Sequence, residues 1–332
     1  MTAMDSTQSA NPGRLRRLFF GPAGIRAGWR FLIFVAIILA LRQGKALLVA
    51  KVLNGLDQDS LSVINLLLAI GILFLATGIM GKFEGRKFAD YGLPWRQTLG
   101  RQFWLGTLFG FTTITALLFA MRMVGVFSFG ERALYGGAIW TFAGLYGLFY
   151  VVGALWEEFL CRGYALFTLS TGIGFWPSAI LSSACFGSLH YFNPGETAFG
   201  AFSAGLFGLL FCLLLRRTGN LWMPIGFHAA YNWGECFLYG APDSGSRAPE
   251  HFLNSSFSGP VWLTGGSVGP EGSLLCILLV VGLCLICAAC FREIKYPGPS
   301  AITGAGRVPA TASNTDPAVS ASSHSKRTEG MT

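Results

Sequence analysis

Two adjacent glutamates, Glu157 and Glu158, lie within a run of mostly apolar residues that begins at Leu145. The run is long enough and apolar enough to lie in a membrane. An ionised carboxylate near the centre of a bilayer costs about 2.5–3.5 kcal/mol on insertion scales, so such residues are rare and usually functional. The glutamate pair is therefore the first candidate for the chemistry of this chain.

Later polar residues add acid–base and hydrogen-bonding groups at membrane depth. Arg162 follows Glu158 by four positions, and the next apolar segments contain His190, His228 and Asn232. Residues four apart share one face of a helix, and a glutamate placed before its basic partner is the better orientation, so we expect Glu158 to pair with Arg162. The same spacing puts His228 and Asn232 on one face of their helix.

Glu157 lies about 100° around the helix from Glu158 and has no partner within its own turn. A carboxylate left free in this way is a candidate general base. The alternative is a structural role, in which both glutamates only hold helices together. Arg162 can fully satisfy one of them, which favours a separate role for Glu157.

The composition predicts an all-α membrane protein. Hydrophobic residues make up 52% of the 332 residues and charged residues 12%, whereas soluble domains carry about 25% charged residues. Apolar runs of about 17–25 residues predict membrane-spanning helices. We expect a polytopic bundle of eight transmembrane helices, with a polar cavity between the helices that carry the polar residues, near 29–48, 61–80, 103–123, 138–168, 175–192, 198–215, 221–239 and 273–291.

The basic residues predict how the bundle is oriented. With a cytoplasmic N-terminus, all but six of the 24 lysines and arginines fall on the cytoplasmic side, as the positive-inside rule requires. The six on the other side are Arg42, Lys45, Lys51, Arg122, Arg132 and Arg247. Both termini are then cytoplasmic, and the net charge of +8 reflects topology. There is no basic soluble domain of the kind that binds nucleic acid.

The chain divides into one membrane domain and two tails. Residues 1–13 and 297–332 are rich in Ser, Thr, Ala, Gly and Pro and are expected to be disordered in the cytoplasm. Residues 14–296 form the membrane-embedded domain, and its polar motifs lie between about 140 and 240.

Three short motifs occur in order on successive membrane segments: E-E-x-x-x-R from Glu157 to Arg162, F-x-x-x-H ending at His190, and H-x-x-x-N from His228 to Asn232. They resemble the three signature motifs of the CPBP family of CAAX-processing and bacteriocin-processing intramembrane proteases, also called Abi, which includes the type II CAAX prenyl endopeptidases. The resemblance covers about residues 140–240. Three motifs in this order at membrane depth are fairly specific.

The resemblance implies hydrolysis of a peptide bond in a membrane-associated or lipid-modified protein or peptide. Glu157 and His190 would hold and activate the attacking water. His228 and Asn232 would stabilise the oxyanion, an effect commonly worth about 2.7–4 kcal/mol for one donor. The motif spacing is similar to that of prokaryotic members, which implies an inner, plasma-membrane location.

By the same resemblance, Glu158 and Arg162 would be a supporting ion pair that fixes the orientation of Glu157. The family has often been labelled metalloprotease, which implies a divalent ion such as Zn²⁺ with Glu157, His190 and His228 as ligands. The residue types favour direct activation of water without a metal, because asparagine is a poor zinc ligand and there is no H-E-x-x-H. We therefore expect no cofactor.

The depth of Glu157 must match that of His190 if the two are to share a water. His190 lies fifteen residues after Phe175, or about 22 Å along a helix. We expect the helix that carries Glu157 to continue past Arg162 to residue 168, which brings Glu157 toward the middle of the membrane.

Two functions from other classes also use buried polar groups. In a proton-coupled transporter, carboxylates and histidines form proton relays, but the chain shows no internal repeat and no matching pair of broken helices. A non-catalytic scaffold or immunity protein of the same fold would not need the complete set of motif residues. We expect the substitution Glu157→Gln to separate these functions, because it removes proteolysis and leaves a scaffold role intact.

The distribution of basic residues predicts opposite sides of the membrane for two positions. Reporter fusions at Gly298 and at Gly245 should give a cytoplasmic signal for the first and an extracytoplasmic signal for the second. The same signal from both fusions would show that the eight-helix topology is wrong.

Overall fold

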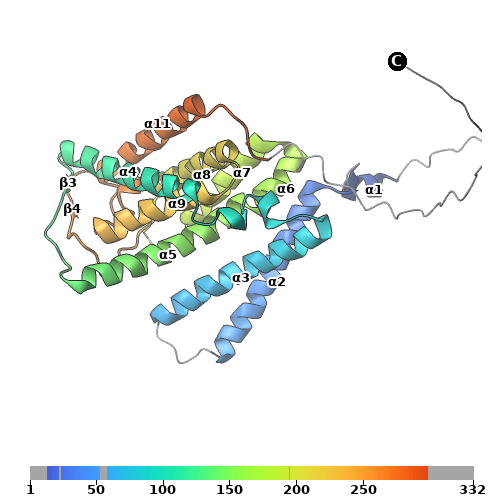
Figure 1. The fold of residues 1–332 in the computed structure, drawn as a ribbon, viewed down its shortest axis with the longest axis horizontal. Coiled ribbons are helices and arrows are strands. Elements are labelled where there is room, and N and C mark those ends of the chain that lie inside the picture. The colour runs from blue at the N-terminus through green and yellow to red at the C-terminus, as the bar shows by residue number, and fades with distance from the viewer. Residues whose placement is uncertain (1–12, 22–23, 53–57, 194, 298–332) are drawn as a thin grey trace, which may run out of the picture.

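The computed structural model describes residues 13–21, 24–52, 58–193 and 195–297. The tails expected to be disordered, 1–13 and 297–332, lie outside the described residues except at Gly13 and Pro297. The described chain is an all-α helix bundle (Figure 1), as the sequence predicts. The strands that accompany the helices are two residues long and form two antiparallel pairs, Phe20–Gly21 (β1) with Gly24–Ile25 (β2) and Phe127–Ser128 (β3) with Ser256–Phe257 (β4).

The helices follow the apolar segments of the sequence. In chain order they are α1 (Arg14–Phe19), α2 (Ala27–Val52), α3 (Gln58–Glu84), α4 (Arg101–Met123), α5 (Gly137–Arg162), α6 (Tyr164–Ile173), α7 (Phe175–His190), α8 (Ala198–Thr218), α9 (Trp222–Asn232), α10 (Val261–Thr264) and α11 (Leu274–Cys290). Short 3-10 turns are η1 (Phe88–Tyr91), η2 (Trp95–Gln97) and η4 (Pro270–Gly272), and a π-helix, η3 (Trp233–Leu238), continues α9.

Four helical segments of the described chain are long and apolar enough to cross a membrane. They are Val63–Glu84, Arg101–Met123, Gly137–Ile173 and Ala198–Thr218. α7, α9 and α11 have 16, 11 and 17 residues, respectively, which is short for a span of about 20 residues. Each of the eight predicted segments is helical, but the number of eight transmembrane helices is not confirmed.

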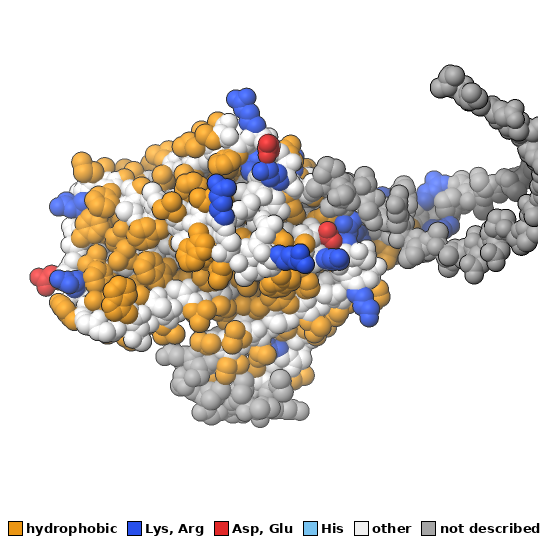
Figure 2. All heavy atoms as spheres, viewed as in Figure 1, with side chains coloured by type: hydrophobic (Ala, Val, Ile, Leu, Met, Phe, Trp, Pro, Cys, Tyr) orange, Lys and Arg blue, Asp and Glu red, His pale blue; other side chains and the backbone are white. Residues whose placement is uncertain are grey.

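The surface of the bundle is that of a membrane protein. Figure 2 shows hydrophobic side chains over much of the visible face, with most of the lysines and arginines toward the end where α1 lies. Large apolar side chains point outward from the long helices, including Leu148 and Trp140 of α5 and Leu75 of α3. Exposed apolar patches of this size in a soluble protein would cause aggregation, whereas lipid covers them in a bilayer.

α9 is the centre of the bundle, and it is buried from Trp222 to Tyr231. It packs against α4, α5 and α8. A helix that is apolar on all sides is stable when other helices enclose it. The side chains of α9 therefore face protein, and the polar ones among them must find partners on neighbouring helices.

α4 approaches α9 closely because glycines line the contact. A methyl group added at Gly110 would lie 2.0 Å from the carbonyl oxygen of Phe227, and one added at Gly226 would lie 2.1 Å from that of Phe103. Gly106 and Gly110 form the small-xxx-small pattern that lets membrane helices pack backbone to backbone. α4 contributes no motif residue, yet it fixes the position of α9.

α5, α6 and α7 form a bent unit that sets the depth of the first two motifs. α5 ends at Arg162, and α6 begins after Gly163, where a side chain would strike the carbonyl oxygen of Phe159 at 2.4 Å. The chain thus stays helical past Arg162 to Ile173, as predicted, but with a break at Gly163 that divides the helix into α5 and α6. A second glycine, Gly174, adopts a φ of +83° and joins α6 to α7.

The lengths of these helices bring His190 to the level of Glu157. α7 packs along α6 and then along α5. It has 16 residues and α6 has 10, so α7 extends past α6 by about 9 Å at 1.5 Å per residue. Glu157 lies about 7.5 Å back along α5 from Arg162 by the same measure. By these lengths, His190 and Glu157 lie at similar heights along the helices.

α2 and α3 are fastened to the rest of the bundle at one end through Glu84. Its carboxylate forms an ion pair with Arg30 of α2, with an N–O distance of 3.1 Å, and accepts a hydrogen bond from the hydroxyl of Tyr164 on α6. Arg30 also donates to the hydroxyl of Thr171 at 2.7 Å. This second buried ionic group is structural and lies apart from the motif residues.

The close contact of α4 and α9 predicts a selective effect of added methyl groups. Gly110→Ala should destabilise the protein by about 1–3 kcal/mol, because overpacking forces the helices apart. Gly153→Ala on α5, where no atom lies within 4 Å of the added methyl, is the matched control and should be neutral or stabilising. Thermal unfolding in detergent, followed by tryptophan fluorescence, measures both; equal losses would contradict the packing argument.

Candidate active site

The ion pair expected from the i,i+4 spacing on α5 is present. Nη1 of Arg162 lies 3.2 Å from Oε1 of Glu158, and both side chains are fully buried. The guanidinium also stacks on two rings, with its central carbon 4.2 Å from the centroid of Phe186 and 5.7 Å from that of Phe211. Cation–π contacts of this kind are stronger when desolvated. Arg162 is thus neutralised by Glu158 and enclosed by aromatic rings.

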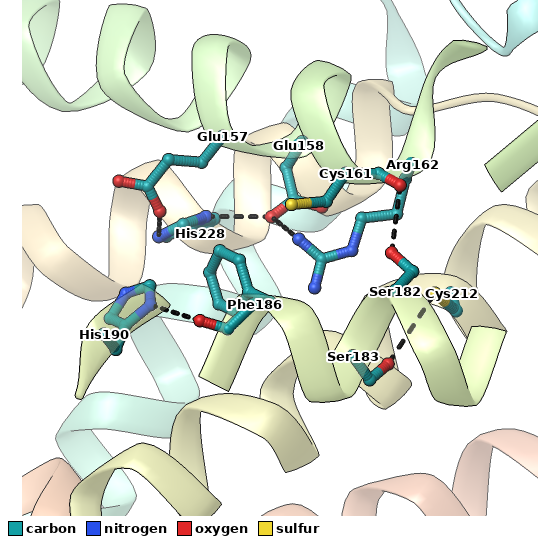
Figure 3. Close-up of polar contacts among 10 residues, drawn as sticks. All are labelled: Glu157, Glu158, Cys161, Arg162, Ser182, Ser183, Phe186, His190, Cys212 and His228. Atoms are coloured by element: carbon teal, nitrogen blue, oxygen red, sulfur yellow. Dashed lines mark hydrogen bonds and ion pairs between the residues drawn. The ribbon is translucent and has the colours of Figure 1, made fainter. Parts of the chain in front are cut away.

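His228 of α9 lies between the two glutamates, as Figure 3 shows. Its Nδ1 is 3.0 Å from Oε1 of Glu158, and its Nε2 is 3.7 Å from Oε2 of Glu157. The carboxylate of Glu158 can only accept, so Nδ1 carries the hydrogen of this bond. Glu158 therefore holds Arg162 and His228, whereas the resemblance implied that the ion pair orients Glu157.

His190 closes α7 and turns its ring toward the same region. Its Nδ1 is 2.9 Å from the carbonyl oxygen of Phe186, one turn earlier, and its ring packs on that of Phe186 with centroids 4.4 Å apart. Because a carbonyl accepts, Nδ1 is the donor and Nε2 is left for another partner. In Figure 3, His190 lies on the side of His228 away from Arg162.

A small cavity joins the second and third motifs. It has a volume of about 30 Å³, and its wall includes His190, His228 and Asn232. Such a volume holds a water molecule, provided that polar partners surround it. The structure thus places Asn232 with the two histidines, and it places Glu157 against His228. Glu157 contacts His228, whereas the family resemblance implied that Glu157 and His190 share a water.

Glu157 keeps one unpaired oxygen. Its side chain is 29% exposed, yet its Oε2 is buried and has no hydrogen-bond partner within the described residues. Buried carboxylate oxygens in native proteins usually have a hydrogen-bond partner. Such an atom is available to a water or to a substrate group.

Three acidic residues near the cavity were missed by the sequence argument. Asp243 and Glu271, from the segment between η3 and α11, contribute to the cavity wall with Ser244. Glu235 lies in η3, and its carboxylate is close to both. The segment after residue 239 has no periodic pattern to predict its contacts. Glu235 could have been found from the sequence, because, like Glu157, it is a carboxylate within an apolar run.

Burial alters the acidity of the two loop carboxyls. It raises the pKa of Asp243 to about 6, and the nearby His228 opposes this rise. Burial, together with the negative charge of Asp243, raises the pKa of Glu271 well above its usual value. Like-charged carboxyls held close together cannot all ionise freely.

The residues implied as zinc ligands do not gather around one point. Among the described residues, the group of three metal-ligating side chains close enough to share an ion is Glu235, Asp243 and Glu271. Glu157, His190 and His228 form no such group. Oxygen-only donors are also poorly suited to Zn²⁺, which favours nitrogen and sulfur. We therefore derive no reaction step through a zinc ion.

The motif-bearing part of the chain matches a known family. The family model described as Type II CAAX prenyl endopeptidase Rce1-like matches residues 138–234, from the start of α5 to the start of η3. All seven motif residues lie within this range, and the predicted resemblance to the CPBP family is confirmed. At the level of the family, the match supports an intramembrane CAAX endopeptidase acting on a membrane-associated substrate. No curated protein matches the chain.

The contacts of Glu158 predict that its loss is mainly a loss of stability. Glu158→Gln leaves the buried Arg162 without its counter-charge, a change that typically costs about 3–5 kcal/mol. Glu157→Gln leaves this pair intact and removes only the longer, 3.7 Å contact with His228, so the unfolding temperature should stay near that of the wild type. The two variants can be compared by thermal unfolding of purified protein and by abundance in membranes. Equal destabilisation by both would contradict this division of roles.

Proposed function

We propose that this protein is an intramembrane endopeptidase that hydrolyses a peptide bond with water activated by Glu157. The observation that supports this best is the unpaired Oε2 of Glu157, which lies 3.7 Å from Nε2 of His228, a residue that lines a cavity large enough for water. The family match supports the same reaction class. By contrast with Oε2 of Glu157, Oε1 of Glu158 is committed to both Arg162 and His228, although its Oε2 also has no hydrogen-bond partner within the described residues.

In the proposed reaction, Glu157 takes a proton from the water as the water oxygen attacks the peptide carbonyl carbon. His190 offers its free Nε2 as a hydrogen-bond acceptor that orients the same water. When the tetrahedral intermediate collapses, the carbon–nitrogen bond breaks and the proton moves from Glu157 to the leaving amine. A single carboxyl group thus serves as base and then as acid.

The negative charge of the intermediate needs donors on the opposite side of the carbonyl. We assign this role to the side-chain amide of Asn232 and to Nε2 of His228. Nε2 must carry a hydrogen for this purpose, so His228 would act with both ring nitrogens protonated, beside the carboxylates of Glu157 and Glu158. Fixed donors in a site from which water is largely excluded are a major source of rate enhancement.

Glu158 and Arg162 are positioning residues in this proposal. The bond from His228 to Glu158 fixes the ring of His228, and the ion pair with Arg162 fixes the carboxylate of Glu158 in turn. Phe186 connects these three residues to His190. Its ring covers the guanidinium of Arg162, and its carbonyl oxygen accepts a hydrogen bond from Nδ1 of His190. Small displacements of catalytic groups cost large factors in rate.

The proposed substrate is a membrane-associated or lipid-modified protein or peptide. The proposed setting is the prokaryotic inner membrane, with residues 14–296 embedded and both termini in the cytoplasm. These assignments follow from the family resemblance and from the basic residues. The reporter fusions at Gly298 and Gly245 test the orientation.

Loss of the base should remove proteolysis. Glu157→Gln is expected to abolish cleavage, and Asn232→Ala is expected to lower kcat by about 10²–10³-fold through loss of one oxyanion donor. Because the cleaved protein is unidentified, the readout is a comparison of membrane peptides from cells that produce the wild type or a variant. Purified protein incubated with a farnesylated CAAX peptide gives a second readout.

Glu131→Gln, an exposed loop variant, is the matched control and should retain cleavage. Treatment with 1,10-phenanthroline, which removes transition metals and leaves Ca²⁺, should also leave activity unchanged. Activity that disappears with phenanthroline and returns with Zn²⁺ alone would overturn the metal-free mechanism. Identical membrane peptides from wild type and Glu157→Gln, with no cleavage of the CAAX peptide by either, would overturn the peptidase function itself.

A further inference from the structure

Three carboxylates from two separate segments converge next to the candidate active site. Glu235 belongs to the π-helix η3, whereas Asp243 and Glu271 belong to the segment between η3 and α11. One carboxylate oxygen from each lies within 4.8 Å of the corresponding oxygens of the other two. We call these three residues the acidic cluster.

The most deeply buried member of the acidic cluster has no partner. Glu235 is fully buried, and neither of its carboxylate oxygens has a hydrogen-bond partner within the described residues. A carboxylate taken out of water without compensation is strongly unfavourable. Glu271 does have hydrogen-bond donors. The hydroxyl of Ser244 donates to its Oε1 at 2.9 Å, and the backbone amide of Ser244 donates to the same oxygen. Glu235 therefore has an oxygen close to two other carboxyl groups, and no hydrogen-bond donor among the described residues offsets its charge.

We propose that the acidic cluster is a binding site for a hard divalent cation of the calcium type. Calcium takes oxygen ligands at about 2.3–2.6 Å, so oxygens on opposite sides of the ion lie about 4.6–5.2 Å apart. The separations within the acidic cluster fall inside this limit. Magnesium requires shorter and more regular octahedral coordination and usually retains several waters, which makes it the poorer fit to three carboxylates on irregular backbone.

A glycine lets the backbone pass close to the acidic cluster. Gly269 has a φ of +120°, and a methyl group added there would lie 2.1 Å from the carbonyl oxygen of Pro242 and 3.4 Å from Oε1 of Glu235. Glycine therefore lets a backbone carbonyl, itself a ligand type that calcium accepts, approach the carboxylate of Glu235. Asp243 and Glu271 also line the small cavity, so two of the three carboxyl groups border space large enough for a water molecule.

The cation would connect the segment after η3 to the π-helix itself. Asp243 and Glu271 form part of the wall of the cavity that contains His190, His228 and Asn232. A cation bound to the acidic cluster thus holds this wall in place while remaining apart from Glu157. The inference does not depend on the peptidase proposal, because it concerns binding and stability.

Calcium binding by the intact purified protein tests the inference. Detergent-solubilised wild type, stripped of divalent ions, should bind one Ca²⁺ per chain in a calorimetric titration and should gain several degrees in Tm with saturating CaCl₂. Glu235→Gln, which preserves the shape of the side chain and removes its charge, should lose both effects. Asp243→Asn provides a second variant on the other segment and should weaken binding at least tenfold.

Two variants serve as controls. Glu250→Gln changes a carboxylate of the same segment, one that accepts a hydrogen bond from Tyr146, and should bind Ca²⁺ as the wild type does. Glu157→Gln should also retain binding, which separates this site from the proposed catalytic groups. Wild type that neither binds Ca²⁺ nor gains Tm would overturn the inference and would indicate that the cluster is neutralised by protons, as would a Glu235→Gln variant that keeps the full calcium shift. Loss of calcium binding in Glu157→Gln would also overturn it, by moving the ion to the motif residues.

Discussion

A guanidinium buried in an apolar bundle must be matched by a carboxylate, and this requirement organises the centre of the protein. Arg162 is enclosed by Phe186 and Phe211 and neutralised by Glu158. Glu158 in turn accepts from His228 of α9. The ion pair thus links α5 to α9, and the ring of Phe186 adds α7. Buried ion pairs contribute little net stability compared with apolar substitutes; the contacts of this one determine which side chains of α5 and α9 face one another.

The site combines two groups of residues with different origins. Glu157, His190, His228 and Asn232 come from helices whose positions are set by close packing and short connections. The acidic cluster comes mostly from irregular chain that folds back over the end of α9. The regular helices fix the positions of the motif side chains, whereas the irregular segment forms the remaining wall of the cavity. Functional groups placed on rigid elements and closed by a loop are a common arrangement in enzymes.

Much of this arrangement could be predicted from the sequence, and the reasons for the rest are physical. Apolar runs predicted every helix from α2 to α11 that belongs to the bundle, and the i,i+4 rule predicted the pair of Glu158 with Arg162. The number of spans was not confirmed, because apolarity alone does not separate a lipid-facing helix from one such as α9 that is enclosed by protein. The break at Gly163 depends on a steric contact with Phe159, which hydropathy does not report.

The partner of His228 and the acidic cluster could not be predicted for a related reason. Spacing along a helix defines which residues share a face, but it does not say which neighbouring helix that face meets. The contacts of Asp243 and Glu271 depend on the path of a segment without periodicity. For such residues, only the cost of burying a charge gives a signal, and Glu235 shows that this signal exists in the sequence of η3.

In the bent unit of α5, α6 and α7, the number of residues in each helix matters more for the position of His190 than the identity of most of those residues. The depth of His190 depends on the difference between the lengths of α6 and α7, counted from Gly163 and Gly174. Deleting or inserting one residue in α7 would move His190 by about 1.5 Å and turn it by about 100° around the helix axis. Many apolar substitutions on the outer faces of these helices can be absorbed by the surrounding lipid. Lipid cannot compensate for an insertion or deletion between Gly163 and His190. Such a change would point the imidazole away from the cavity even if every helix still formed.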